Sequence, residues 1–321
     1  MSFSSDVKEE LSRQISTARH CQTAEIAAII SLSGKIAVSE DDKYSIKVHT
    51  ENVSVARKYF TLVKKTFNIN TEISIRQNAS LKKRRTYTLT ASDHEDSIRI
   101  LQATKLIDTN MEMKDDLSLV DNLVIQQICC KRSFIRGAFL AAGSISAPEK
   151  SYHFEIVCDT LRKATQLQEI IKTFEVDAKI IGRKKHFVVY IKEGTQIVEI
   201  LNVMEAHVAL MDLENIRILK DMRNTVNRKV NCETANISKT VSAAIKQIED
   251  IKYIRDTVGF EELSDGLKEI ALLRLEQPEA TLRELGEMLD QVVGKSGVNH
   301  RLRKLSIIAE SLRENKEEKD L

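Results

Sequence analysis

The sequence predicts an α+β N-terminal domain, built from two tandem repeats of the order αββαββα, followed by an all-α C-terminal domain. Two observations predict the repeats: three landmarks recur in the same order, and both copies alternate between helical and strand-like hydrophobic periods. A third observation, four successive helical segments after residue 237, predicts the C-terminal domain. The 321 residues are 42% hydrophobic and 30% charged, which is enough apolar material for a core in each domain.

The landmarks of the duplication are a glycine that ends a helix, a Lys-Thr-Phe segment and an apolar Ile-Leu pair. Their order is kept while their offset shrinks, so we interpret the region as an ancient tandem duplication whose second copy has shorter loops. The matching segments are Gly34 and Gly143, Lys65–Phe67 and Lys172–Phe174, and Arg99–Gln102 and Glu199–Asn202, with offsets of 109, 107 and 100 residues.

Each copy is expected to contain the same elements in the same order. In the first copy, the pattern predicts a helix over about 22–33 and then strands over Lys35–Val38 and Tyr44–Thr50. A helix over about 52–67, a hairpin of Glu72–Gln77 with Tyr87–Ala91, and a short helix are expected to follow. The second copy predicts a helix over about 121–142, strands over Ser144–Ser146 and Tyr152–Asp159, a helix over about 160–174, a hairpin of Lys179–Gly182 with Phe187–Lys192, and a short helix. Two such units build two four-stranded sheets around a central pair of helices.

The two central helices carry small residues at helical spacing, which predicts that their backbones approach closely. The alternative explanation is that alanine is simply a good helix former, without any role in packing. Gly137 favours close packing as the explanation, because a mid-helix glycine costs about 1 kcal/mol and needs a packing reason. The small residues are Ala24, Ala28 and Ser31 in the first helix and Gly137, Ala138, Ala141 and Ala142 in the second.

These helices resemble the motif helices of the LAGLIDADG homing endonucleases. Ile135–Gly143 matches the nine-residue motif, and Ile26–Gly34 matches it more weakly. In that family, the next-to-last motif residue of each helix is an acid that binds the catalytic Mg²⁺. Those positions hold Ser33 and Ala142 here, and neither can ligate a hard cation as a carboxylate does. The sequence therefore predicts a degenerate LAGLIDADG-like domain that is not an enzyme; an active endonuclease, which would need other acids, is the less favoured alternative.

Basic residues gather at the equivalent hairpin of each copy. Twin basic hairpins could follow the phosphates of DNA. Alternatively, these charges only keep the sheet edges soluble. Arg76 lies on the first hairpin, and the candidate phosphate contacts are Lys82, Lys83, Arg84 and Arg85 in the first copy and Arg183, Lys184 and Lys185 in the second.

The segment after the second repeat is expected to be a connector. Residues 210–230 predict one polar, basic helix, and Asn231–Asn236 interrupts its periodicity and predicts a linker. The expected domains are an N-terminal helix (1–20), the degenerate LAGLIDADG-like domain (21–208, with repeats of about 21–105 and 121–208), the connector helix and linker (209–237), a helix-turn-helix domain (238–315) and a charged tail (316–321).

The C-terminal domain is expected to contain helices over about 238–256, 265–276, 281–289 and 295–313. Thr281 and Glu284 predict a capping box at the start of the third helix, and Gly286 suits the close approach of another helix. A short turn, Asp290–Gly294, precedes the fourth helix, so the pair describes a helix-turn-helix. The third helix is expected to bury one apolar face, formed by Leu282, Leu285, Met288 and Leu289.

The last helix presents a polar, basic face opposite Val298, Leu302 and Leu305. Residues 291–309 hold four basic residues and no acid, although residues 231–321 hold 14 Lys and Arg against 18 Asp and Glu. This contrast favours DNA binding over a merely solvated face, with Asn, His and Arg reading base edges and Lys and Ser contacting phosphates. The candidate DNA contacts are Lys295, Ser296, Asn299, His300, Arg301, Arg303, Lys304, Thr281 and Arg283.

Several segments resemble the WhiA family of bacterial DNA-binding regulators. They are Lys268–Glu276, Leu282–Gly286, Lys295–Leu305, Asn227–Asn236 and Ser2–Leu11. The resemblance covers essentially the whole chain. It implies a sequence-specific transcription regulator that binds double-stranded DNA, of a type linked in related bacteria to sporulation, cell division and chromosome segregation. The alternative is a protein-docking or nucleoid-associated module that binds DNA without sequence preference.

The cysteines predict no metal site and no disulfide scaffold, because none lies in a CxxC pair or near a histidine at zinc spacing. No stretch approaches the roughly 18 apolar residues of a membrane helix, and the N-terminus lacks the apolar core of a secretory signal. We therefore expect a cytoplasmic protein without cofactor, membrane contact or small-molecule ligand. The DNA binding that the resemblance implies would associate it with the nucleoid, and a protein partner on the N-terminal domain is a further option. The five cysteines are Cys21, Cys129, Cys130, Cys158 and Cys232.

Overall fold

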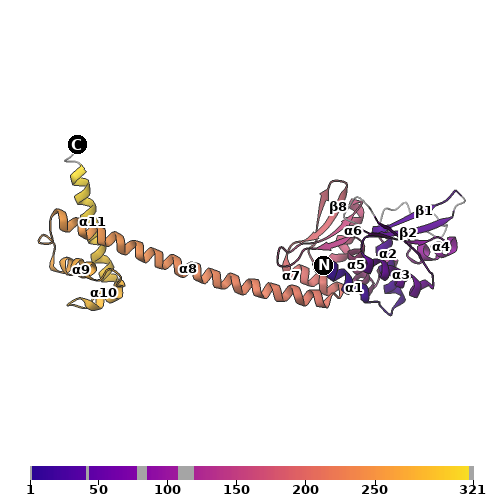
Figure 1. Cartoon of the computed structure of the whole chain (residues 1–321), viewed down its shortest axis with the longest axis horizontal. Coiled ribbons are helices and arrows are strands. Elements are labelled where there is room, and N and C mark those ends of the chain that lie inside the picture. Colours follow the sequence, from indigo (N-terminus) through magenta and orange to yellow (C-terminus); the bar gives the residue numbers. More distant parts are fainter. Residues whose placement is uncertain (1, 41–42, 78–84, 108–118, 318–321) are drawn as a thin grey trace. The chain divides into compact units, whose positions relative to one another are not determined.

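The computed structural model describes residues 2–40, 43–77, 85–107 and 119–317, and it divides into two compact units, residues 1–221 and 222–321. The first unit contains α1 (Phe3–Arg13) and two α+β repeats, and the second is helical (Figure 1). Among the described helices, none combines the length and hydropathy that a membrane crossing requires.

The two repeats have the same architecture, as the fold class predicted. Each forms a four-stranded antiparallel sheet, ordered β1-β2-β4-β3 in the first repeat and β5-β6-β8-β7 in the second. The first repeat contains α2 (Arg19–Ser33), β1 (Gly34–Val38), β2 (Tyr44–Thr50), α3 (Val53–Phe67), β3 (Glu72–Gln77), β4 (Arg85–Ala91) and α4 (His94–Ala103). The second contains α5 (Ile128–Ala142), β5 (Gly143–Ile145), β6 (Phe154–Cys158), α6 (Leu161–Lys172), β7 (Lys179–Arg183), β8 (His186–Ile191) and α7 (Gly194–Met204).

The landmark glycines end α2 and α5 in almost the same backbone conformation. Gly34 has φ −89° and ψ 154°, and Gly143 has φ −88° and ψ 156°. A Cβ atom on Gly34 would lie 2.4 Å from the Ile30 carbonyl oxygen, and one on Gly143 would lie 2.3 Å from the Phe139 ring. Each helix therefore turns into its first strand at a position too crowded for a side chain, which explains why both copies have glycine there.

Helices α2 and α5 pack against each other between the two sheets (Figure 1). A Cβ atom on Gly137 would lie 2.6 Å from the Glu25 carbonyl oxygen and 2.9 Å from the Ala28 Cβ. The predicted close approach of the two backbones is thus confirmed, and Gly137 provides the room for it.

One helix was expected over residues 121–142, and the predicted start of this helix is wrong. A 3₁₀ turn covers Asn122–Val124, and α5 begins only at Ile128. Asp121 explains the early turn, because its carboxylate accepts a hydrogen bond from the Leu123 N–H at 2.8 Å. Such a side-chain cap closes a short turn independently of the helix that follows.

The helix α8 (His207–Thr257) continues without a break through Asn231–Asn236, where a linker was expected. Residues 221–243 are exposed around the whole helix, so no buried face imposes a hydrophobic period. The loss of periodicity therefore marked an unpacked stretch of helix and not a loop. This stretch contains neither Gly nor Pro, and each of its residues costs at most about 0.7 kcal/mol relative to alanine in a helix.

The second unit packs the end of α8 against α9 (Asp265–Glu276), α10 (Leu282–Met288) and α11 (Lys295–Glu317). The bounds of α9, α10 and α11 agree with the predicted helices to within a few residues, whereas the helix expected over 238–256 is the last part of the longer α8. Its buried apolar side chains come from all four helices, so the unit has a core of its own. They are Ile251, Ile254, Leu267, Ile270, Ala271, Leu285, Leu289, Val298, Leu302, Leu305 and Ala309.

Candidate nucleic-acid interface

The first helix of the helix-turn-helix, α10, begins with the predicted capping box. The Thr281 hydroxyl accepts from the Glu284 N–H at 3.3 Å, and the Glu284 carboxylate accepts from the Thr281 N–H at 2.7 Å. This second bond holds the pKa of Glu284 below its usual value, because it favours the charged carboxylate. Thr281 therefore caps the N-terminus of α10 with both its hydroxyl and its backbone N–H.

The turn between α10 and α11 folds back tightly onto α10. The Val293 N–H donates to the Gly286 carbonyl oxygen at 3.0 Å. A Cβ atom on Gly286 would lie only 2.1 Å from the Val293 carbonyl oxygen and 3.2 Å from the Val298 side chain. Gly286 therefore permits the close approach that the sequence predicted, here to the turn and to the first turns of α11.

We expect Gly286→Ala to lower the free energy of unfolding of the second unit by about 1–3 kcal/mol, because the new methyl group must push the turn away. Gly294→Ala is the matched control, since nothing lies within 4 Å of its added Cβ atom, and it should stay within about 0.5 kcal/mol of the parent chain. Urea denaturation followed by circular dichroism measures both. Equal stabilities of the two variants would contradict the crowding at Gly286.

The helix α11 presents the predicted polar face to solvent. Val298, Leu302 and Leu305 are buried in the core of the unit. Six of the candidate contacts on this helix are exposed, so they are free to reach a partner: Lys295, Ser296, Asn299, His300, Arg303 and Lys304.

Two expectations for this motif are corrected by the structure. Arg301 does not belong to the exposed face: it donates to the Gly266 carbonyl oxygen at 3.4 Å and pairs with Glu269 at 3.8 Å. It lies only 60° around the helix from Val298, by the roughly 100° step per residue, and so points toward α9. Met288 is 53% exposed and does not join the buried face of α10, because that helix ends there.

Arg274 holds the loop between α9 and α10 in place from inside the unit. Its side chain is only 3% exposed. The guanidinium donates to the Gln247 side-chain oxygen at 2.9 and 3.1 Å and to the Ala280 carbonyl oxygen at 2.6 Å. This loop leads directly into the capping box, so Arg274 positions the start of α10. Sequence reasoning missed it, because an arginine in a helix gives no signal that it is buried.

In the first unit, the outer face of the first sheet is basic. The register pairs Lys35 with Lys47 across β1 and β2, and Arg76 lies on the same face of β3. His49 also lies there, and its Nδ1 is 3.0 Å from the Thr88 hydroxyl. Burial, and then the charges of Lys35, Lys47 and Arg76, lower the pKa of His49. This face therefore has a positive local potential that attracts anions.

The corresponding face of the second sheet differs. Arg183 is exposed but lies 3.6 Å from the Glu155 carboxylate, which also accepts from the Ser144 hydroxyl. Val157, Val188 and Ile181 share this face in register. Both hairpins carry basic residues, but the outer face of the second sheet is less basic than that of the first. Arg85, Lys184 and Lys185 are exposed, and Arg283 is exposed beside Glu287; Lys82, Lys83 and Arg84 lie outside the described residues.

The positions that hold metal-binding acids in the endonucleases lie at the C-terminal ends of α2 and α5. The Ser33 hydroxyl donates to the Ile29 carbonyl oxygen at 2.8 Å, so it is used within its own helix. The Lys163 ammonium donates to the Ser31 carbonyl oxygen at 3.0 Å and pairs with Asp159 at 3.1 Å. The end of α2 thus faces an ion pair and a used hydroxyl, and these two positions supply no carboxylate for a Mg²⁺ ion.

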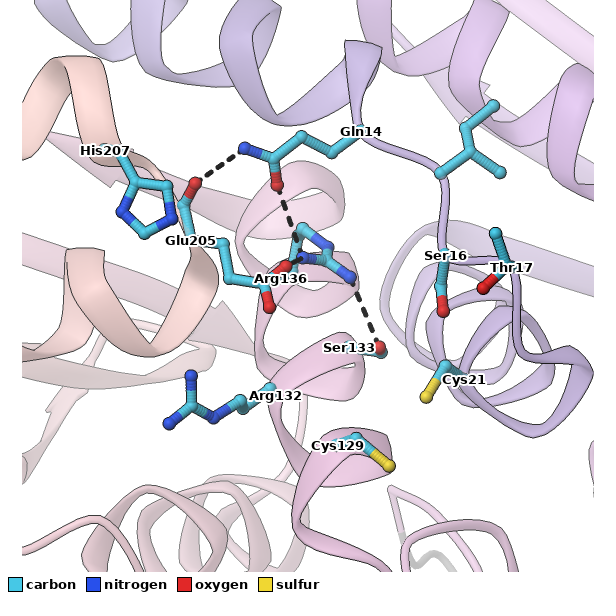
Figure 2. A pocket seen from close by; sticks show the side chains of 11 residues that line it. Gln14, Ser16, Thr17, Cys21, Cys129, Arg132, Ser133, Arg136, Glu205 and His207 are labelled. Atoms are coloured by element: carbon cyan, nitrogen blue, oxygen red, sulfur yellow. Dashed lines mark hydrogen bonds and ion pairs between the residues drawn. The ribbon is translucent and has the colours of Figure 1, made fainter.

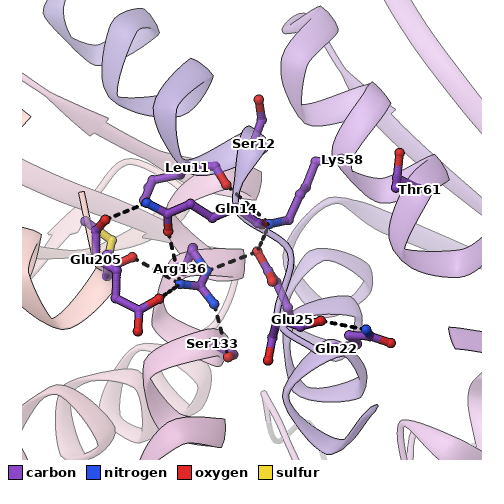
Figure 3. Close-up of polar contacts among 12 residues, drawn as sticks. Leu11, Ser12, Gln14, Gln22, Glu25, Lys58, Thr61, Ser133, Arg136 and Glu205 are labelled. Atoms are coloured by element: carbon purple, nitrogen blue, oxygen red, sulfur yellow. Dashed lines mark hydrogen bonds and ion pairs between the residues drawn. The ribbon is translucent and has the colours of Figure 1, made fainter. Parts of the chain in front are cut away.

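A buried group of charges joins α1, α2, α3 and α5 near the middle of the first unit (Figure 3). The Glu25 carboxylate pairs with Lys58 at 3.0 Å and with Arg136 at 3.4 Å, and these side chains are at most 3% exposed. Arg136 also pairs with Glu205 at 2.5 Å, and Lys58 donates to the Leu11 carbonyl oxygen at 3.2 Å. This network fixes the N-terminal helix and the end of α7 to the central pair.

A pocket of about 490 Å³ opens beside this network, and Cys21 and Cys129 lie close together in its lining (Figure 2). They belong to a cluster with His20 and Cys130, in which each residue has a metal-ligating atom within 4.8 Å of the others. Burial raises the pKa of the Cys130 thiol to about 11. Zinc-site spacing along the sequence does not reveal this cluster, since its two halves come from different helices. The signal was present: His20–Cys21 precedes Cys129–Cys130 by the same 109 residues that separate Gly34 from Gly143.

The fold and the interface define a chain with a tandem LAGLIDADG-like domain and a helix-turn-helix domain. Family models match all three parts: the WhiA N-terminal LAGLIDADG-like domain at residues 19–107, the WhiA LAGLIDADG-like domain at 131–223 and the WhiA C-terminal HTH domain at 226–309. The chain belongs to the WhiA family.

Relatives align along almost the full length. A protein of Lachnoclostridium phytofermentans named probable cell division protein WhiA is 57% identical over 98% of this chain and 100% of its own. The protein of that name from Alkaliphilus oremlandii is 49% identical over 98% of this chain and 99% of its own. The crystal structure of full-length DUF199/WhiA from Thermatoga maritima has a TM-score of 0.59 and 26% identity, and covers 97% of this chain and 99% of that one.

Proposed function

We propose that this protein is a sequence-specific, double-stranded DNA-binding regulator that takes part in cell division. The observation that carries the proposal is the exposed face of the first three turns of α11, residues 295–304, which holds six polar or basic side chains able to contact bases or phosphates and no acid. The relatives named as probable cell division proteins support the cellular role. Transcription regulation, sporulation and chromosome segregation are finer roles that remain part of this proposal, as does an association with the nucleoid.

The two surfaces have different tasks in this proposal. Base edges are read by Asn299, His300 and Arg303, while Lys295 and Ser296 hold phosphates beside them. The basic face of the first sheet adds phosphate contacts through Lys47 and Arg76, which carry no sequence information.

We further propose that the chain has no nuclease activity. Hydrolysis by two metal ions needs carboxylates that hold the ions against the attacking and leaving oxygens. The replacement of both acids by Ser33 and Ala142 supports this absence.

The decisive experiment incubates the purified full-length chain with sheared genomic DNA and Mg²⁺ at physiological salt, and then sequences bound fragments and their ends. A discrete motif with intact ends is the expected result. Uniform, weak recovery would instead support the second candidate, a module that binds DNA without sequence preference; the basic outer face of the first sheet is the observation that favours it. New ends at fixed positions would contradict the absence of nuclease activity.

Arg303→Ala should weaken binding to the recovered motif by about 1–3 kcal/mol and relax the preference at one base pair. The reason is that a guanidinium on this face can bond two acceptors of one base, and alanine cannot. Competition assays with the motif and with random duplex measure the effect. Arg255→Ala, which changes an exposed arginine of α8, is the control. An equal loss on both duplexes would show that Arg303 contacts only phosphates.

Lys47→Ala combined with Arg76→Ala should reduce the slope of log K against log[salt] by about 0.9 for each phosphate that is no longer neutralised, up to about 2 for the pair. The preference for the motif over random duplex should stay the same. Binding measured between low and physiological salt tests this. An unchanged slope would place DNA away from the first sheet.

A further inference from the structure

Four metal-ligating side chains converge at the N-terminal ends of the two central helices. His20 and Cys21 lie in the first turn of α2, and Cys129 and Cys130 lie in the first turn of α5. The His20 Nδ1 is 3.1 Å from the Cys130 Sγ and 3.4 Å from the Cys21 Sγ. With Cys129 included, one ligand atom of each residue lies within 4.8 Å of the other three.

We propose that His20, Cys21, Cys129 and Cys130 bind one Zn²⁺ ion, which joins the two repeats. Zinc bonds of about 2.3 Å to sulfur and about 2.0–2.1 Å to nitrogen give tetrahedral ligand-to-ligand distances of roughly 3.6–3.8 Å. The observed separations extend from 3.1 Å to at most 4.8 Å. The observed separations thus bracket the distances that a tetrahedral zinc site requires.

The donor set selects the kind of metal. Three thiolates and one imidazole are soft to borderline ligands, which suit Zn²⁺, whereas Mg²⁺ and Ca²⁺ require oxygen atoms. Four protein ligands complete a tetrahedral shell and leave no position for water or substrate, which is the arrangement of a structural zinc site. The ion would stabilise the fold and would not take part in hydrolysis.

The duplication explains why two pairs meet at one point. His20 and Cys21 are separated from Cys129 and Cys130 by 109 residues, the offset of the helix-ending glycines. The pairs therefore occupy equivalent positions in the two copies, and the packing of α2 on α5 brings them together. This end of the pair is opposite to Ser33 and Ala142; α2 has 15 residues and is about 20 Å long, so the site is remote from the endonuclease metal positions.

The surroundings suit a filled site. Three thiolates around Zn²⁺ leave one net negative charge, which the positive N-terminal ends of α2 and α5 stabilise. Neither helix has a side chain that caps its first turn. Arg19 and Arg132 line the pockets on either side of the cluster and add positive charge nearby.

The cluster is accessible to an incoming ion while its inner half is protected. Cys21 and Cys130 are buried, and His20 and Cys129 are exposed. The pocket of about 490 Å³ reaches Cys21 and Cys129, and a second pocket of about 410 Å³ reaches His20 and Cys130. An ion can therefore enter from the exposed ligands and be held by the buried ones.

The test measures the metal content of the full-length chain, purified under reducing conditions without a chelator, by inductively coupled plasma mass spectrometry. One zinc per chain is expected. Exchange for Co²⁺ should give the thiolate-to-cobalt charge-transfer band and the intense visible bands of a tetrahedral ion. Cys129→Ser and His20→Ala, which change exposed residues, should each lower zinc affinity by at least about 100-fold, more than the roughly 10–100-fold of an outer-shell change.

Cys232→Ser is the matched control, since it removes an exposed cysteine of α8 and should keep the metal and the cobalt spectrum. A chelator should lower the Tm of the first unit in the parent and in this control, and leave that of Cys129→Ser unchanged. The proposal is overturned if the folded chain with reduced thiols binds neither ion. It is also overturned if mass spectrometry finds a disulfide within the cluster in the protein as isolated from cells.

Discussion

Glu25→Ala should lower the free energy of unfolding of the first unit by about 3–5 kcal/mol, a loss typical of a buried ion pair from which one partner is removed. Glu25 lies between Lys58 and Arg136, and all three side chains are at most 3% exposed. Burial lowers the pKa of Lys58, and the Glu25 carboxylate opposes that shift. Without this carboxylate, the ammonium stays buried with only carbonyl oxygens beside it.

Scanning calorimetry of the full chain measures this effect. The loss corresponds to a decrease of roughly 10 °C in the Tm of the first unit, at 2–4 °C per kcal/mol for a domain of this size. Glu9→Ala is the control, because it removes an exposed carboxylate paired with Arg13 and should cost at most about 1 kcal/mol. The double variant Glu25→Leu/Lys58→Met should recover about half of the loss, because it leaves no unpaired ammonium. A single variant as stable as the control would contradict the charge network.

Arg274→Ala should destabilise the second unit by about 3 kcal/mol or more and abolish DNA binding, while the transition of the first unit stays unchanged. Its guanidinium bonds the Gln247 side chain and the Ala280 carbonyl oxygen, and these acceptors are partly buried, so each one left unpaired costs up to about 1–3 kcal/mol. A domain of this size has only about 5–15 kcal/mol of stability in total. The start of α10 should therefore lose its position.

Arg274→Lys distinguishes hydrogen bonding from charge. An ammonium cannot bond both sides of the loop as a planar guanidinium does, so this variant should behave nearly like Arg274→Ala. Arg255→Ala, on the surface of α8, should have no effect on stability beyond about 0.5 kcal/mol. Calorimetry and a DNA-binding assay on the same samples test both statements. A fully active Arg274→Lys would show that only the positive charge matters.

Local patterns sufficed for most of the fold. The expected bounds of β2 and β3 are those of the structure, because alternation over Tyr44–Thr50 and turn-flanked Glu72–Gln77 are local signals. The prediction of a linker at Asn231–Asn236 was wrong because a local signal was missing there: a helix that is exposed on all sides has no buried face that a sequence pattern could reveal. The exposed face of α11 followed from helical geometry, and only Arg301, which lies on the side of the helix toward α9, was misplaced.

The candidate sites depend on contacts between distant segments, and these were harder to predict. Glu25 and Lys58 are two charges among many until α2 and α3 are packed together. The four metal-ligating residues form two ordinary pairs along the chain and become a cluster only when α2 meets α5. Here the duplication offset carries the missing information, because it aligns one pair with the other in the sequence itself.

The two repeats are related by an approximate two-fold axis between α2 and α5, and joining them in one chain affects which side chains can lie near this axis. In a dimer of identical chains every substitution appears twice, so an acid at the axis would face another acid. In the fused chain, position 25 is an acid while its counterpart, Phe134, is apolar, and Arg136 has Ala27 as its counterpart. A dimer of identical chains would carry an ion pair across the axis twice, whereas the fused chain can carry it once because the halves mutate independently. The same freedom lets one sheet become basic while the other does not, so the two halves of a single chain present different surfaces.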